Sequence, residues 1–415
     1  MIHSSRSSFS GVLSDNGEHE QPVRLYGSEF SQDPAQLYRD LRRRYGAVAP
    51  ILLDGDVPAW LVVGYREIYY ICDNPQLFAR NTQRWNGWDT TPENWSLLPF
   101  VGYQPSLMFT EDAEHQRRAG AISDALDAID RLELRSLCEQ TADDLVDAFC
   151  GNGVADLMTD FAHPTPALVV AKLLGLTGAQ ARQLTADLTV SLDGGDGAVP
   201  AYQRVAQRMG DLLKTKRAMP GSDVPSRLIE HPAQLADDEM QQDLLVVLAA
   251  AQQPTANWIG NTLRLMLTDT RFAVTLAGGR RSVGQALAQV LWQDTPTQNF
   301  IGRFAVRNTN LAGKHIQAGD MLVLGLAAGN ADPQVHPAGD PGESGNRAHV
   351  SFGHGEHGCP YPAPELAQVI AQAAIEVLLD RLPDLDLSVT PDELVWRESV
   401  WMRGLHSLPV RFTPA

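Results

Sequence analysis

The segment from Asp237 to Thr268 constrains the fold more than any other part of this chain. Its apolar residues recur at spacings of three and four, which predicts one long α-helix. Around Leu244–Ala251 the pattern is apolar on nearly all sides, so this helix should run through the middle of the molecule. Pro254 lies inside the segment and has no backbone N–H, which predicts a kink or a local loosening there. We therefore expect a mainly α-helical fold built around this helix.

Other segments support the same class of fold. Short strand signals predict two hairpins and a last strand pair, so a small β region should accompany the helices. The first residues form a polar arm (1–25), and the rest (26–415) is expected to be a single domain. Further helical patterns cover 111–150, 154–190, 197–218 and 282–292, and the strand signals cover 51–64, 311–326 and 401–412.

Composition excludes several classes of function. The chain has 33 Lys and Arg against 50 Asp and Glu, and its net charge of −17 argues against nucleic acid as the main partner. No apolar run reaches the roughly 18–20 residues that cross a membrane, and the N-terminus lacks the layout of a secretory signal. We therefore expect a cytoplasmic protein. The four cysteines are too few for a disulfide framework: Cys72, Cys138, Cys150 and Cys359.

One of these cysteines stands in an unusual loop. Residues 352–360 read Phe-Gly-His-Gly-Glu-His-Gly-Cys-Pro, and their three glycines allow a tight turn with inward-pointing N–H groups. A helical pattern starts at about Glu365, which places Cys359 just ahead of a helix N-terminus. There, N–H donors and the helix dipole favour a thiolate, which is a good soft ligand for haem iron.

On the residues alone, two other interpretations stay open. Cys359 could be a buried core thiol, which is the usual state of an isolated cysteine. It could also bind zinc together with His354 and His357, although the His-x-x-His-x-Cys spacing is uncommon and no fourth ligand is evident.

A resemblance to a known family favours haem. Residues 352–359 match in full the Phe-Gly-x-Gly-x-His-x-Cys signature of the cytochrome P450 family, and the chain resembles that family over roughly residues 30–412. The resemblance implies the family's fold, a triangular helical prism with small β-sheets, of the bacterial soluble type. The other segments that resemble the family follow in its order: Glu114–Arg117 (helix C), Ala250–Asn261 (helix I), Arg303–Ala305 and Gly313–Asp320 (the strand region after helix K), and Asn330–Pro333 with Asn346–Arg347 (the meander).

The resemblance also implies a cofactor, haem b, and the residues that bind it. Cys359 would be the axial ligand of the iron, within a loop that includes Phe352 and Gly353. Side chains that can donate to the haem propionates are His115, Arg303 and His357.

One family position that contacts the haem is changed. The family usually has an arginine four residues after the His115 position, and this chain has Ala119 there. Arg118 or Arg117 could substitute for it. Alternatively, both could belong to a solvated basic patch on the face that meets the redox partner.

Two further departures concern the core of the family pattern. Where helix K normally carries Glu-x-x-Arg, this chain has Gln289 and Trp292, a variant that resembles a subgroup of actinobacterial members. Where helix I normally carries an acid followed by threonine for proton delivery, it has Gln253 and Pro254, with Thr255 next. Glutamine is no proton source at neutral pH, so protons must arrive through water, Thr255, the substrate or another route.

The expected substrate pocket is rich in indole and amide groups. Such side chains suit a flat aromatic guest that carries amides, although two of the tryptophans in 83–95 could simply form the core of their loop. The residues that we expect to line the pocket are Gln83, Trp88, Ala250, Gln253, Thr297, Gln298, Phe300, Val400 and Trp401.

These features together predict a haem-thiolate oxidase of natural-product biosynthesis. The helix I and helix K variants resemble enzymes that couple a tryptophan-containing cyclic dipeptide (a diketopiperazine) to another ring, forming a C–C or C–N bond through a ferryl species. The chain contains no flavin or iron–sulfur segment, so electrons should come from a ferredoxin and its reductase. The alternatives are hydroxylation of another small molecule, peroxide-driven oxidation, or a haem-binding sensor or scaffold with little turnover.

Overall fold

The computed structural model describes residues 21–193, 197–269, 272, 283–335 and 346–414. Most of the predicted arm lies outside this description, and its last residues enter a strand at Val23–Arg24. Among the described helices, none combines the length and the apolar character that crossing a bilayer requires.

The fold is mainly helical, as predicted. The helices are α1 (Ser28–Gln32), α2 (Pro34–Tyr45), α3 (Tyr65–Cys72), α4 (Leu98–Val101), α5 (Asp112–Asp127), α6 (Arg131–Asp147), α7 (Pro164–Leu173), α8 (Gly178–Asp193), α9 (Ala198–Ala218), α10 (Val224–Glu230), α11 (Asp237–Thr268), α13 (Val283–Gln293), α14 (Leu326–Asn330) and α15 (Ala363–Arg381). The strands are β1 (Val23–Arg24), β2 (Val48–Leu53), β3 (Val57–Val62), β4 (Phe78–Ala79), β5 (Val154–Asp156), β6 (Phe300–Ala305), β7 (Thr309–Leu311), β8 (Lys314–Ile316), β9 (Met321–Leu324), β10 (Asp386–Leu387) and β11 (Pro409–Arg411).

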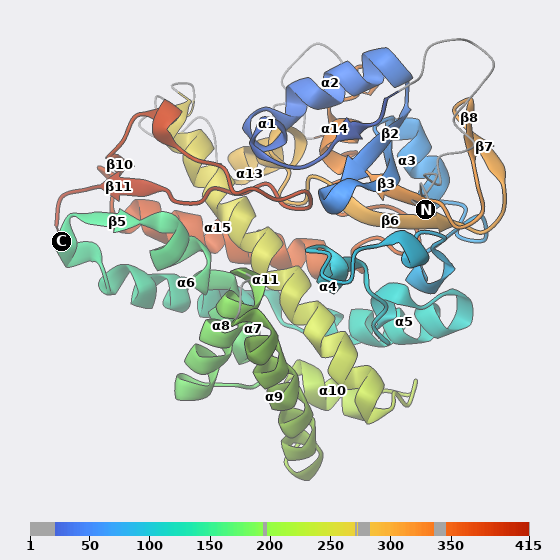
Figure 1. The fold of residues 1–415 in the computed structure, drawn as a ribbon. Coiled ribbons are helices and arrows are strands. Elements are labelled where there is room, and N and C mark those ends of the chain that lie inside the picture. The colour runs from blue at the N-terminus through green and yellow to red at the C-terminus, as the bar shows by residue number, and fades with distance from the viewer. Residues whose placement is uncertain (1–20, 194–196, 270–271, 273–282, 336–345, 415) are drawn as a thin grey trace.

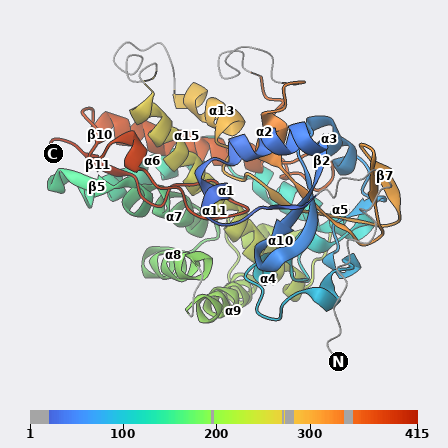
Figure 2. The same ribbon diagram turned by 45° about the horizontal axis from the view of Figure 1, so that its top comes forward.

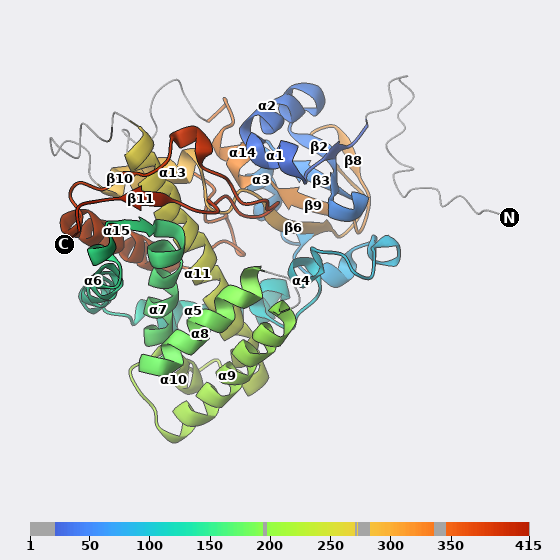
Figure 3. The same ribbon diagram turned by 60° about the vertical axis from the view of Figure 1, so that its left-hand side comes forward.

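Helix α11 is the central element. Its 32 residues make it about 48 Å long at 1.5 Å per residue, and it packs against α7, α9, α13 and α15. Figure 1 shows it crossing the molecule, with the sheet on one side and α8–α10 on the other; Figure 3 confirms this separation. Helices α8 and α9 lie side by side (Figure 2). The prediction of an enclosed helix at 237–268 is therefore confirmed.

The main sheet has six strands in the order β1-β2-β3-β9-β6-β4. Strands β2 and β3 form the predicted hairpin, whose turn places Gly55 and Asp56 at φ 73° and 57°. The turn has three residues, Asp54–Asp56, and three-residue hairpin loops commonly include a residue with positive φ. Strand β9 pairs in parallel with β3 and antiparallel with β6, so it joins the hairpin to the strand that carries Arg303.

Three predicted elements differ from the structure. The segment 111–150 is two helices, because Asp130 accepts hydrogen bonds from the N–H groups of Leu132 and Glu133 and starts α6 there. The segment 154–190 begins with strand β5 and divides between α7 and α8, where Gly175 has φ 77°. The predicted pair at 401–412 was wrong, since it yields only β11, which pairs with β5 and β10.

Candidate active site

The cysteine loop is a tight turn that packs on the end of α3. The backbone N–H of Cys359 donates to the carbonyl of Phe352 at 2.7 Å. Gly353 and Gly355 have φ of 73° and 70°, a conformation that glycine adopts without strain. A Cβ atom at Gly355 would lie 2.7 Å from the carbonyl oxygen of Cys72, so only glycine fits against α3 there.

Protein atoms surround the Cys359 thiol, but solvent still reaches it. The side chain is exposed, yet protein surrounds it so closely that burial raises the pKa of the thiol to about 12. A side chain that solvent reaches, although protein atoms surround it on most sides, lines an internal space. Burial therefore opposes the thiolate that we expect the loop and the start of α15 to favour. A cation at the sulfur, such as iron, would favour the thiolate.

Two arginines are buried close to one another near this loop. Arg303 of β6 and Arg80, which follows β4, are each 2% exposed, and both donate from Nη1 to the carbonyl oxygen of Gly302, at 3.4 and 2.8 Å. The Nε of Arg303 has no hydrogen-bond partner among the described residues. Burial lowers the pKa of both guanidinium groups, and in Arg80 repulsion from Arg303 lowers it further. In the described part of the chain, neither arginine forms an ion pair with a carboxylate. Arg80 was not predicted as a site residue.

The two predicted histidines stack on one another beside these cations. The rings of His115 and His357 are 3.9 Å apart between centroids. In His115, Nδ1 lies 2.9 Å from the carbonyl oxygen of Leu107 and Nε2 lies 3.1 Å from that of Glu356. Burial, with smaller contributions from His115, Arg303 and Arg80, lowers the pKa of His357 to about 2. The imidazole of His357 is therefore neutral near pH 7.

This set of donors fits a haem. A flat iron porphyrin needs a soft ligand for the metal and cationic or N–H donors for two carboxylates. Cys359 supplies the thiol, and Arg303 brings a buried cation whose Nε forms no hydrogen bond with any atom in the described part of the chain. Residues from the cysteine loop, β6 and α5 thus meet in one region, although they are far apart in the sequence.

Arg117 and Arg118, the two arginines of α5 that could replace the family's helix-C arginine, form ion pairs with α11. The guanidinium of Arg118 is 2% exposed and forms an ion pair with Asp243 of α11. The guanidinium of Arg117 pairs with Glu239, one turn earlier on the same helix. Both groups are therefore committed to carboxylates of α11.

Helix α11 presents a mixed apolar and amide face. Ala250 is exposed and Gln253 and Pro254 are partly exposed, although the helix runs through the centre of the fold. Thr255, the residue after Pro254, is buried. The helix continues without interruption through Pro254. The side chain of Gln253 forms no hydrogen bond with any residue that the structure describes, so its amide is available to a ligand.

Most of the tryptophans between 83 and 95 form the core of their own loop. Trp85 and Trp95 are buried and stack at 5.7 Å, and Trp88 meets Trp85 edge-on at 4.8 Å. The indole N–H of Trp88 donates to the carbonyl of Thr82 at 2.8 Å. Gln83 is exposed. These contacts give the tryptophans a structural role in holding the loop.

The residues after α13 and near the C-terminus form one loop system. Gln298 is 3% exposed, and its Nε2 donates to the carbonyls of Ser399 and Met402 at 2.6 and 3.1 Å. Val400 and Trp401 are buried, whereas Thr297 and Phe300 are partly exposed. Gln298 therefore fixes the position of the loop 399–402, while Thr297 and Phe300 remain accessible.

The variant pair on α13 is packed as a neutral contact. Gln289 and Trp292 are both buried. The indole N–H of Trp292 donates to the carbonyl of Asn346 at 3.0 Å, and its ring meets His349 edge-on at 5.8 Å. A hydrogen bond and ring contacts thus link α13 to the segment before the cysteine loop.

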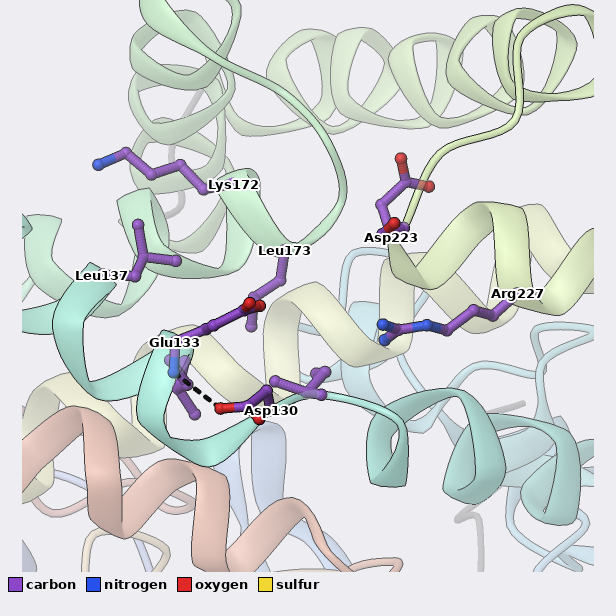
Figure 4. A pocket seen from close by; sticks show the side chains of 10 residues that line it. Asp130, Glu133, Leu137, Lys172, Leu173, Asp223 and Arg227 are labelled. Atoms are coloured by element: carbon purple, nitrogen blue, oxygen red, sulfur yellow. Dashed lines mark hydrogen bonds between the residues drawn. The ribbon is translucent and has the colours of Figure 1, made fainter.

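A pocket of about 150 Å³ between α6, α7 and α10 is a weaker candidate site (Figure 4). Of its charged side chains, all but Glu133 have partners among the described residues. Asp130 caps α6, Lys172 donates to Thr141, Asp223 pairs with Lys216, and Arg227 donates to the carbonyl of Ala125. These contacts leave the pocket with little unpaired charge for a ligand.

Comparison with known proteins identifies the family. No protein-family model matches the chain. The cytochrome P450 monooxygenase PikC of Streptomyces venezuelae is 30% identical over 399 residues, which cover 93% of this chain and 92% of PikC. Vitamin D(3) 25-hydroxylase of Pseudonocardia autotrophica is 29% identical over 94% of this chain and 96% of its own.

Solved structures with a similar fold are also cytochrome P450 proteins. The bacillaene polyketide synthase cytochrome P450 PksS of Bacillus subtilis has a TM-score of 0.82 at 26% identity, covering 94% of this chain and 99% of that one. The P450 monooxygenase TamI has a TM-score of 0.81 at 27% identity, covering 94% of both chains. Together with the cysteine loop and the donors around it, these matches with bacterial proteins show that the chain belongs to the cytochrome P450 family, oxidoreductases that hold haem through a cysteine thiolate.

Proposed function

We propose that the protein oxidises an aromatic small molecule that carries amides, such as a tryptophan-containing cyclic dipeptide, and couples it to a second ring through a C–C or C–N bond. The observation that carries this proposal is Gln253, whose partly exposed amide forms no hydrogen bond with the described residues. A primary amide has both donors and acceptors, and a cis amide of a cyclic dipeptide offers one of each along a single edge.

Pro254 adds a second polar group to the same face. Because proline has no N–H, the carbonyl of Ala250 loses the donor that would normally bond it within the helix. Ala250 is exposed and lies one turn before Gln253. A carbonyl acceptor and an amide are thus available together on a surface that is otherwise apolar, which suits an N–H-bearing aromatic guest better than an alkyl chain.

Each site residue has a proposed role. When bound, the haem supplies the one-electron and dioxygen chemistry. Cys359 would hold the iron, and Arg303, His357 and His115 would bind the propionates. Thr255 carries the one hydroxyl in residues 250–256 and would pass protons from water towards the reacting centre. Electrons would come from a ferredoxin and its reductase, in the cytoplasm.

Hydroxylation of another small molecule is the second candidate. PikC is named a monooxygenase, and another relative is named for hydroxylating vitamin D(3). A protein of the same fold, CxnD, is described as forming a C–S bond in chuangxinmycin biosynthesis, so this fold also accommodates bond formation between heavy atoms. Mass spectrometry of the product separates the two, because hydroxylation adds one oxygen atom and coupling adds none.

An optical titration tests the substrate class. The ligands are the cyclic dipeptide of tryptophan and alanine, the same compound methylated on both ring nitrogens, and a fatty acid. We expect a shift of the Soret band to shorter wavelength with the first ligand alone, and about tenfold weaker binding of it by Gln253→Leu, as for one lost hydrogen bond. No shift with the cyclic dipeptide, or an equal response to its methylated form, would refute the proposal.

A further inference from the structure

Arg80 is buried, unlike most arginines in proteins. It follows β4, which pairs with β6, and its side chain is buried between two aromatic rings. The guanidinium carbon lies 4.9 Å from the centroid of Phe300 and 5.9 Å from that of Phe109. These contacts hold the group in a fixed orientation beside the strand that carries Arg303.

The protein satisfies only part of this guanidinium. Its Nε donates to the carbonyl of Met108 at 3.1 Å, and its Nη1 donates to the carbonyls of Ile301 and Gly302. All of these acceptors are neutral. The N–H groups on Nη2 have no hydrogen-bond partner in the described part of the chain.

Arg80 and Arg303 form a cationic pair without a counter-ion. Both donate to the same carbonyl oxygen, that of Gly302, and no described carboxylate forms an ion pair with either. A buried charge without a partner is strongly destabilising, so two such charges side by side require an anion. A group with two carboxylates meets that requirement.

The chain also lacks a cation at a position where its family has one. Ala119 stands at the family position of the helix-C arginine, and the neighbouring Arg117 and Arg118 are paired with Glu239 and Asp243. A haem propionate would therefore find no free arginine on this helix, and both ring nitrogens of His115 already contact backbone carbonyls.

We propose that Arg80 binds a haem propionate with the N–H groups that it does not use on the protein, and so replaces the helix-C arginine that this chain lacks. Arg80 and Arg303 then share the negative charge of the two propionates. The hydrogen bonds to Met108, Ile301 and Gly302 are the support that holds Arg80 in place for this purpose.

The test compares the rate of haem loss in four proteins: the wild type, Arg80→Met, Arg80→Lys and Arg84→Met. Methionine keeps the apolar packing and removes the charge, whereas lysine keeps the charge. Arg84 lies on the same loop, but it is exposed and pairs with Glu111, so its variant is the matched control. We expect transfer of haem to excess apomyoglobin to be about tenfold faster in Arg80→Met, partly restored in Arg80→Lys, and unchanged in Arg84→Met.

A second measurement separates binding of the propionate from support of the fold. The wild type and Arg80→Met are loaded with haem and with its dimethyl ester, whose propionates carry no charge. If Arg80 binds a propionate, the variant loses haem faster than the wild type but loses the ester at the same rate. If the variant loses both compounds faster by the same factor, or neither, Arg80 only supports the strand and the proposal is overturned.

The thermal midpoint of the haem-free protein gives an independent check. The haem-free Arg80→Met loses an unpaired buried cation but also three hydrogen bonds to backbone carbonyls, so its midpoint should differ little from that of the wild type. Its haem-loaded form should melt clearly lower. A drop in both forms by the same amount would instead assign Arg80 a structural role and contradict the proposal.

Discussion

Arg118 of α5 and Asp243 of α11 form an ion pair that is closed to solvent. The Nε of Arg118 lies 2.9 Å from Oδ2 of Asp243 and its Nη2 lies 2.5 Å from Oδ1, while the two side chains are 2% and 0% exposed. Asp243 also accepts the backbone N–H of Leu107 at 2.7 Å. One carboxylate thus joins α11, α5 and the turn that leads into α5, which is the turn that contacts His115.

Replacement of Asp243 by asparagine should destabilise the protein strongly. The substitution leaves the charge of Arg118 buried without its main partner, and breaking a buried pair costs about 3–5 kcal/mol. Urea unfolding, followed by circular dichroism, measures the loss. Asp237→Asn is the control, because its exposed pair with Arg217 contributes at most about 1 kcal/mol. Equal losses in the two variants would show that solvent or another carboxylate screens Arg118.

Trp292 allows a test of the neutral contact on α13. Trp292→Arg alone should lower the free energy of unfolding by about 3 kcal/mol, because the new cation faces the neutral amide of Gln289. Adding Gln289→Glu should recover more than half of this loss by restoring the family's ion pair. The control adds Gln285→Glu instead, at an exposed position about two turns earlier on the same helix. If the losses simply add in the first double variant, the two side chains do not face each other.

His349 should make stability depend on pH. Burial, and to a smaller extent Arg347, lowers its pKa to about 4 from 6.5, so the unfolded chain takes up the proton first. The stability that neutral His349 contributes is therefore complete above pH 6.5 and is lost as the pH falls towards 4, by at most about 3 kcal/mol.

His349→Phe isolates this effect from the titration of carboxylates. Phenylalanine keeps the ring contacts with Trp292 and Phe352, and the Nδ1 that it removes makes no hydrogen bond with a residue that the structure describes. The thermal midpoints of variant and wild type should be similar at pH 7.5 and should diverge below pH 6.5, with the variant more stable. Parallel curves down to pH 4 would show that His349 does not titrate in this range.

The sequence predicted those parts of the fold that depend on local patterns. The long helix at 237–268 and the hairpin at 51–64 have strong periodicity and turn residues, and both were confirmed. The strand β11 was mispredicted in its pairing, because its partners β5 and β10 are set by tertiary contacts that no local pattern encodes. The break between α7 and α8 was missed, although Gly175 marks it.

The site residues also divide into those that a local pattern predicts and those that depend on tertiary contacts. Cys359 and Arg303 were found through motifs, and the structure brings their segments together. Arg80 was missed because no motif marks it, although the missing arginine at Ala119 was a reason to look for another cation. The roles of Trp85 and Gln298 depend on whether a side chain faces the pocket or the loop core, and a linear pattern leaves that choice open.

A substitution at Gly302 is the change near the site for which the structure predicts the largest effect. A Cβ atom there would lie 1.2 Å from the carbonyl oxygen of Leu322, so alanine must push β6 away from β9. The register of these strands already shifts between Phe300 and Arg303, which leaves little room to adjust. We expect Gly302→Ala to lose about 4 kcal/mol or more, a loss typical of forced backbone displacement in a core.

The same substitution should also remove haem, because the carbonyl of Gly302 accepts hydrogen bonds from both Arg80 and Arg303. The thermal midpoint and the ratio of Soret to protein absorbance should therefore fall together. Gly120→Ala is the matched control, since nothing lies within 4 Å of its Cβ position in α5 and alanine there should add up to about 1 kcal/mol. A variant at Gly302 with normal haem content but a lower midpoint would mean that the two arginines find their positions without this carbonyl, and that the strand contact serves stability alone.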